Sequence, residues 1–144
     1  MFDPKKIVIH HSATVDGSTY SWHAIHNYHV RVRGWLDIGY HAGIEEVLGS
    51  YAVLYGRPLT VVGAHARGHN AEALGFCFVG NWDVRAPERA RLEEAARRCL
   101  VPWCQIFSIH PDEIVPHSSL GNKTCPGTKF PMDRLREIVS GLLI

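Results

Sequence analysis

The chain has 144 residues, of which 46% are hydrophobic and 20% are charged, and its 15 basic residues nearly balance 14 acidic ones. This length suits one domain with a core of its own, so residues 1–144 are predicted to form a single domain. The even charge balance argues against a disordered tail and against nucleic acid as a partner. No stretch approaches the roughly 20 apolar residues of a membrane span, so we expect no membrane insertion.

The N-terminal sequence MFDPKKIVIHHSAT places two lysines before an apolar run that histidines interrupt, and no small-residue cleavage site follows. We therefore expect no signal peptide and synthesis in the cytoplasm. The four cysteines are too few and too scattered for the framework of a small disulfide-bonded domain. The ten histidines are more informative, because imidazole both ligates zinc and carries protons near neutral pH. A monomer is the default expectation.

The first expected elements are a strand and a helix. Residues 6–11 are rich in β-branched side chains, which predicts a strand buried on both faces that brings His10 or His11 to the end of a sheet. Ser21 can cap a helix that ends before Gly34. Its expected apolar positions are Trp22, Ile25, either Tyr28 or His29, and Val32. A polar surface stripe is expected at His23, His26 and His29.

The remaining elements alternate between strands and helices, which predicts an α/β fold. Runs 38–44 and 51–55 are expected to form an antiparallel hairpin through the turn at 48–50, and run 74–79 a buried strand that contains Cys77. From Leu92 to Phe107 the apolar residues follow helical spacing, with Cys99 and Cys104 on the core face. Pro102 is expected to kink this helix or divide it into two abutting helices. The last predicted helix, 132–143, is expected to pack as a lid on the sheet.

The segment PHSSLGNKTCPG places His117, Lys123 and Cys125 in one loop. Histidine and thiolate are favoured zinc ligands, and a catalytic zinc site uses three protein ligands and leaves the fourth position to water. A third ligand can come from His10 or His11, because the end of a strand is rigid. The alternative is that Cys125 is a small buried hydrophobic residue and that His117 bonds to the backbone.

Five blocks occur in order along the chain: IVIHHSAT (7–14), GWLDIGYHAGI (34–44), GAHARGHN (63–70), LGFCFVGNW (74–82) and PHSSLGNKTCPG (116–127). Together they resemble the zinc N-acetylmuramoyl-L-alanine amidases, a family that phage amidase lysozymes share with peptidoglycan recognition proteins. The resemblance covers nearly the whole chain. It implies a central mixed β-sheet flanked by helices, and an enzyme that cleaves the amide bond between N-acetylmuramic acid and L-alanine in peptidoglycan.

The resemblance also implies a role for individual residues. It places the zinc ligands at His10, His117 and Cys125, or at His11 in place of His10 if the strand register is shifted. The assisting tyrosine falls on Tyr40, which would orient the attacking water or donate a hydrogen bond to the tetrahedral oxygen. A phage-type lysine falls on Lys123, whose charge would stabilise the same oxygen. Without the resemblance, Tyr40 is expected to be a core residue and Lys123 a solvated loop charge.

Further histidines lie in these blocks, but tetrahedral zinc leaves no position for them. We expect His41, His65 and His69 to contact substrate or to hold the ligands in place. Asn70 is predicted to contact substrate, or else to be a turn residue.

Two alternative functions share this fold: a peptidoglycan-binding module without catalysis, and a cytoplasmic amidase that recycles soluble muropeptides. The binding members of the family typically lack the cysteine, and the recycling enzymes carry aspartate at that position, so Cys125 argues against both. The expected setting is a phage or prophage lysin that acts on the bacterial cell wall.

Overall fold

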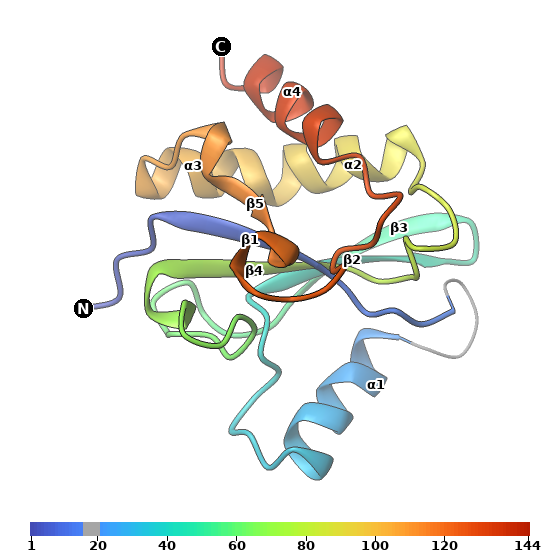
Figure 1. Cartoon of the computed structure of the whole chain (residues 1–144), viewed down its shortest axis with the longest axis vertical. Helices are drawn as coiled ribbons and strands as arrows, with labels where there is room; N and C mark the ends of the chain where they lie inside the picture. The colour runs from blue at the N-terminus through green and yellow to red at the C-terminus, as the bar shows by residue number, and fades with distance from the viewer. Residues whose placement is uncertain (16–20) are drawn as a thin grey trace.

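The computed structural model describes residues 1–15 and 21–144. Five strands form one sheet in the order β3-β2-β4-β1-β5 (Figure 1). β1 pairs in parallel with β4 and β5, β2 pairs in parallel with β4, and β2 and β3 are antiparallel. The predicted mixed sheet is therefore confirmed. The strands are β1 (Lys6–His11), β2 (Ala42–Val47), β3 (Ser50–Tyr55), β4 (Ala73–Phe78) and β5 (Ile114–Pro116).

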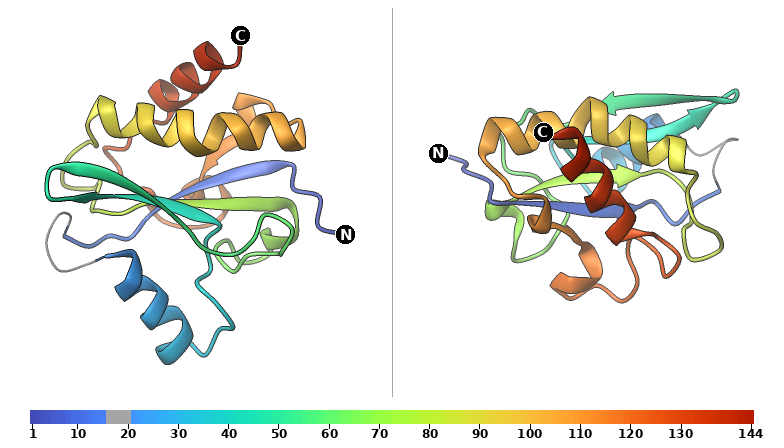
Figure 2. Two further views of the ribbon diagram at one scale, coloured as in Figure 1. Left: turned by 180° about the vertical axis from the view of Figure 1, so that it is seen from behind. Right: turned by 90° about the horizontal axis from the view of Figure 1, so that it is seen from above.

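Helices cover the two faces of the sheet unequally. Figures 1 and 2 show α2, α3 and α4 over one face and α1 beside the other. The helices are α1 (Trp22–Asn27) with a π turn at Tyr28–Val32, α2 (Arg89–Ala95) with a π turn at Ala96–Leu100, α3 (Val101–Phe107) and α4 (Met132–Leu142). Short 3-10 turns lie at Asn70–Glu72, Pro111–Glu113 and His117–Leu120. The face beside α1 is thus the more open one, and it carries the functional groups described below.

The alternation of side chains along β1 determines which residues face each layer. Ile7 and Ile9 are fully buried in the core under the helical layer, whereas Val8 packs with Ala66 on the other side. β1 is buried on both faces, as predicted. His10 has the same parity as Val8, so its ring lies on the open face of the sheet.

The amphipathic stripe predicted from Leu92 onward is confirmed as the core face of the helical layer. Its buried members are Leu92, Ala95, Ala96, Cys99, Leu100, Trp103 and Cys104. Of the kink or division expected at Pro102, the structure shows two abutting helices, α2 and α3, which a π turn joins into one continuous run of helix (Figure 1). A π turn precedes the proline, with the Val101 N–H donating to the Ala96 carbonyl. This wider turn keeps the helix continuous at the residue that has no N–H to donate.

Arg91 joins the helical layer to the β2–β3 hairpin. Its side chain is fully buried, and its guanidinium lies 4.9 Å from the ring centre of Trp82 and 5.1 Å from that of Tyr51. Glu88 and Glu46 pair with it at 3.1 and 3.6 Å. A buried guanidinium needs such partners to offset the loss of hydration.

The predicted hairpin is confirmed, but its first strand begins at Ala42 and not at residue 38. Residues 37–41 are irregular because other groups hold their backbone: the Arg57 guanidinium donates to the carbonyls of Asp37 and Ile38. The strand continues instead to Val47. The two-residue turn that follows is Leu48-Gly49, in which both residues have positive φ, 51° and 81°, as the twist of a tight hairpin requires.

The position predicted for the last helix is also wrong. α4 packs against the α2–α3 helix and β5, and not as a lid on the sheet (Figure 2). Its apolar face is buried there through Leu135, Ile138 and Val139. The reason is that the long α2–α3 helix already covers that face of the sheet.

Candidate functional site

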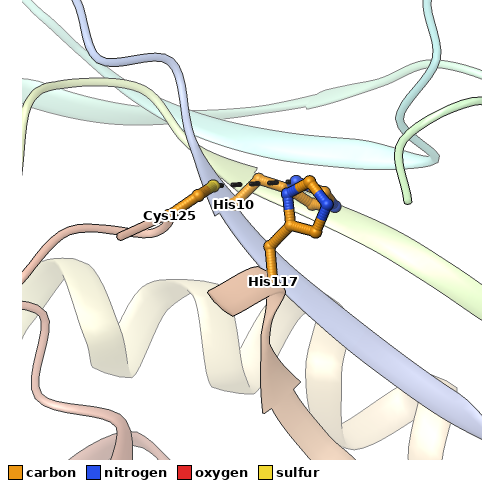
Figure 3. A group of neighbouring side chains, drawn as sticks. All are labelled: His10, His117 and Cys125. Carbon is orange, nitrogen blue, oxygen red and sulfur yellow. Dashed lines mark hydrogen bonds between the residues drawn. The ribbon is translucent and has the colours of Figure 1, made fainter. Parts of the chain in front are cut away.

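Three predicted ligands converge on the open face of the sheet. The ligand atoms of His10, His117 and Cys125 all lie within 4.8 Å of one another, and no other group of three such residues occurs in the described part of the chain. Figure 3 shows the two imidazole rings and the thiol directed toward one another. His11 points to the opposite face, where its Nδ1 accepts the Trp82 N–H at 3.3 Å. The geometry therefore selects His10 from the two histidines of β1.

β5 brings His117 to His10. β5 pairs with β1 so that Pro116 lies opposite Ile9. The residues that follow these two in the chain, His117 and His10, are the two histidines of the cluster. Their ring centres are 4.6 Å apart. This strand was missed in the sequence because it has three residues, and the short apolar pair before Pro116 was its only signal.

Cys125 is held by bonds to its backbone and to its sulfur. Its N–H donates to the Asn122 Oδ1 at 3.0 Å, and its carbonyl accepts the Ser118 N–H at 2.8 Å. The Sγ accepts the backbone N–H of His11 at 3.4 Å and lies 3.8 Å from Nδ1 of His10. Burial raises the pKa of the Cys125 thiol to about 11, so a thiolate at this position needs a nearby cation. Two imidazoles and one thiolate are a donor set that suits zinc and leaves its fourth position open.

His10 is linked to a second histidine. Its Nε2 lies 2.9 Å from Nδ1 of His65, and Nε2 of His65 lies 3.1 Å from the Ala73 carbonyl oxygen. Burial lowers the pKa of His10 well below its ordinary value of 6.5 and lowers that of His65 to about 3. Both rings are therefore neutral at physiological pH, and a neutral imidazole is the form that ligates a metal.

Tyr40 lies beside the cluster, with its ring centre 5.1 Å from that of His10. It packs against a buried cluster that contains Cys77, which lies in the core as predicted. Burial is the main cause that raises the pKa of Tyr40 well above 10. The phenol therefore keeps its proton and can serve as a hydrogen-bond donor.

His29 belongs to this site, so the prediction of a polar surface stripe is wrong for it. Its Nδ1 accepts the Gly39 N–H at 3.0 Å, and its ring centre lies 4.5 Å from Trp35 and 5.6 Å from Tyr40. In the open choice between Tyr28 and His29, the histidine faces inward, while 51% of Tyr28 is exposed. Val32, expected on the apolar face, is 69% exposed, and α1 slants away from the sheet toward this end (Figure 1).

The other predicted residues do not reach the cluster. His41 accepts the Gly75 N–H at Nδ1 and bonds through Nε2 to the Val61 carbonyl at 2.8 Å. His69 pairs with Glu72 at 2.7 Å. The Asn70 Oδ1 accepts the N–H groups of His65 and Ala66, which is the role of a turn residue. Lys123 is exposed in the loop that carries Cys125.

Two hollows flank the three-residue cluster. One, of about 770 Å³, is lined by Arg33, Trp35, Ala64, His65, Ala66, Arg67, Gly68, Asn70, His117, Leu120, Gly121 and Asn122. The other, of about 550 Å³, is lined by Ser12, Thr14, Ala24, Ile25, Tyr28, His29 and Tyr40. His117 lines the first and Tyr40 the second, so an extended ligand that occupies both would pass the cluster. No helix in residues 1–15 and 21–144 is long and apolar enough to cross a membrane.

The fold and the site define a class of α/β proteins that hold a His-His-Cys cluster beside an open groove. The N-acetylmuramoyl-L-alanine amidase family matches residues 2–128, and the chain belongs to this family. The endolysin of Escherichia phage T7 is 34% identical over 122 residues, which cover 83% of this chain and 78% of the endolysin. The solved N-acetylmuramoyl-L-alanine amidase LysC from Clostridium intestinale URNW has a TM-score of 0.75 at 29% identity, covering 99% of this chain and 87% of that one.

A longer relative is the N-acetylmuramoyl-L-alanine amidase of Mus musculus, which is 38% identical over 108 residues. That match covers 72% of this chain but 19% of the mouse protein. The chain therefore spans about a fifth of that relative and most of the phage endolysin.

Proposed function

We propose that the chain is a zinc-dependent amidase that hydrolyses the bond between the lactyl group of N-acetylmuramic acid and L-alanine in peptidoglycan. The convergence of His10, His117 and Cys125 beside an open groove carries this proposal. Membership of the amidase family and the similarity to a phage endolysin support it. The bacterial cell wall is the proposed place of action.

The proposed ligands would hold zinc through the two imidazoles and the thiolate. Bound zinc supplies a nucleophile at neutral pH, because it lowers the pKa of water to about 7. Tyr40 stays protonated and is proposed to orient the attacking water or to donate a hydrogen bond to the oxygen of the scissile carbonyl. Lys123 is proposed to bring positive charge to that oxygen as it becomes negative.

The groove suits a substrate that carries carboxylates. Arg33 and Arg67 line the larger hollow together with His117, and guanidinium groups bind carboxylates in a planar, two-bond geometry. A peptide joined through the scissile amide carries at least its terminal carboxylate, which such groups bind. The chemistry of the lining therefore agrees with a peptide substrate that carries a carboxylate.

The test compares the purified protein with Cys125→Ala. We expect one zinc per wild-type chain, and release of new L-alanine amino groups from cell walls that stops after chelation and returns with added zinc. Cys125→Ala should retain its fold and lose both the metal and the hydrolysis. Hydrolysis that persists in this variant would refute the mechanism.

The same preparations separate the two alternative functions. A binding module would sediment with cell walls and release no amino groups. A recycling enzyme would cleave soluble muropeptides much faster than polymeric wall. We expect the polymeric wall to be a substrate, because the groove is open on the surface and is lined for an extended ligand.

A further inference from the structure

His65 lies between a proposed zinc ligand and the backbone of β4. One ring nitrogen, Nδ1, is 2.9 Å from Nε2 of His10, and the other, Nε2, is 3.1 Å from the Ala73 carbonyl oxygen. The His65 ring meets that of His10 edge to face, with centres 5.0 Å apart. These contacts use both nitrogens of His65 and the one nitrogen of His10 that does not face Cys125.

The order of donors and acceptors in this chain of contacts follows from the carbonyl group. A carbonyl oxygen only accepts, so Nε2 of neutral His65 must carry the hydrogen. Nδ1 of His65 is then an acceptor, and Nε2 of His10 must donate to it. The hydrogen of His10 is thereby placed on Nε2, and the lone pair of its Nδ1 is directed toward Cys125, where the metal would lie.

The surrounding residues leave room for this ring. A Cβ at Gly75 would come within 2.6 Å of the His65 ring, and one at Gly63 within 2.7 Å. The backbone of His65 is fixed as well, because its N–H donates to the Asn70 Oδ1 at 2.9 Å. The absence of a side chain at these two glycines thus leaves space for the His65 imidazole beside His10, and Asn70 fixes the backbone that carries it.

We propose that His65 is a positioning residue that fixes the tautomer and the ring orientation of His10, so that Nδ1 of His10 binds the zinc ion. Asn70 and Gly75 support it from the loop and the strand. This inference rests on the zinc site proposed above. The contact partners of metal-binding histidines typically change metal affinity about 10- to 100-fold when they are removed.

The test measures zinc affinity by competition with a chelator in the full chain. His65→Leu removes both hydrogen bonds and should weaken zinc binding about 10- to 100-fold. His65→Asn keeps an acceptor oxygen near the position of Nδ1, so it should lose less affinity than the leucine variant. His110→Leu changes an exposed histidine that pairs with Asp112 and should leave the affinity unchanged.

A second readout uses the metal-free protein. Long-range proton–nitrogen NMR correlations should show His10 protonated at Nε2 in the wild type and a mixture of both tautomers in His65→Leu. Thermal unfolding of the same samples shows whether the variants remain folded, and His65→Asn serves if the leucine variant does not.

The outcomes distinguish this inference from the proposed function. If the wild type binds zinc and cleaves cell walls, but His65→Leu and His65→Asn bind zinc as tightly, the positioning role is wrong and the function stands. An unchanged His10 tautomer in a folded His65→Leu would also overturn the inference. If the wild type binds no zinc, the proposed function itself fails.

Discussion

The backbone N–H of His11 donates to the Sγ of Cys125 at 3.4 Å, although 114 positions separate the two residues. The ring of His11 meanwhile binds the Trp82 N–H on the opposite face of the sheet. β1 thus supplies a ring to the metal cluster through His10 and a backbone donor to the thiol through His11. The cluster therefore depends on the contacts that β5 and the loop at 117–127 make with β1.

Tyr40→Phe tests the proposed contribution of the phenol. The change removes one hydroxyl from a ring that lies 5.1 Å from that of His10 but outside the ligand cluster. We expect kcat on cell walls to fall about 100-fold, as for loss of one preorganised donor, with the zinc content unchanged. Tyr55→Phe is the control, because Tyr55 is 66% exposed on β3 and should keep full activity. If Tyr40→Phe retains wild-type kcat, the tyrosine has only a packing role.

Substitutions of Lys123 test whether its charge contributes to catalysis or is only a solvated charge of the loop. If its ammonium stabilises the tetrahedral oxygen, Lys123→Ala should lower kcat by about 100-fold and Lys123→Arg by less, with KM little changed. Lys129→Ala removes a nearby exposed lysine whose Nζ donates to the Val84 carbonyl, and it should leave kcat unchanged. Equal kcat values for Lys123→Ala and Lys129→Ala would show that Lys123 is an ordinary loop charge.

Sequence patterns predicted the elements whose periodicity is long or whose turns are well marked. The stripe from Leu92 to Cys104 and the hairpin at Leu48-Gly49 both follow from spacing that burial and turn geometry impose. β5 was missed because its three residues contain no period. The position of α4 depends on the fact that the α2–α3 helix covers the sheet, and local spacing does not contain that information.

The ligand cluster was predicted through the resemblance to the amidase family, because a histidine eight residues before a cysteine is not by itself an established zinc-binding spacing. The contacts around the cluster could not be predicted. His29 repeats at the spacing of a polar stripe, yet it is turned inward by its bond to the Gly39 N–H. The link from His10 to His65 joins residues 55 positions apart through ring nitrogens, and spacing does not reveal such a bond.

Arg91 should be important for stability, because its buried guanidinium pairs with Glu46 and Glu88 and lies over Trp82. Arg91→Met keeps most of the volume but removes the cation between Glu46 and Glu88, although Glu88 keeps its pair with Arg85. We expect the free energy of unfolding in urea to fall by about 2–3 kcal/mol, which is below the roughly 3–5 kcal/mol of a fully buried broken pair because both glutamates are partly exposed. Arg89→Met removes an exposed pair with Glu93 on the same helix and should cost less than about 0.5 kcal/mol. Equal losses in the two variants would show that the buried pairs of Arg91 stabilise the fold no more than an exposed pair does.

His29 should contribute to the pH dependence of the free energy of unfolding. Burial lowers its pKa from 6.5 to about 4, and its Nδ1 can accept the Gly39 N–H only while it is unprotonated. Between pH 6.5 and 4 the unfolded chain therefore binds a proton that the folded chain does not, so the free energy of unfolding falls as the pH falls. The loss should level off below about pH 4, where both states are protonated.

Urea unfolding at several pH values between 7 and 4 measures this contribution as the difference between wild type and His29→Asn, which keeps an acceptor oxygen and cannot titrate. Because the ring is half-buried, we expect the wild type to lose about 1 kcal/mol more than the variant across this window. The other histidines titrate in both proteins and cancel in the difference. His23→Asn changes an exposed histidine of the same helix and should retain the wild-type slope. If His29→Asn retains that slope as well, then His29 protonates in the folded chain as readily as in water.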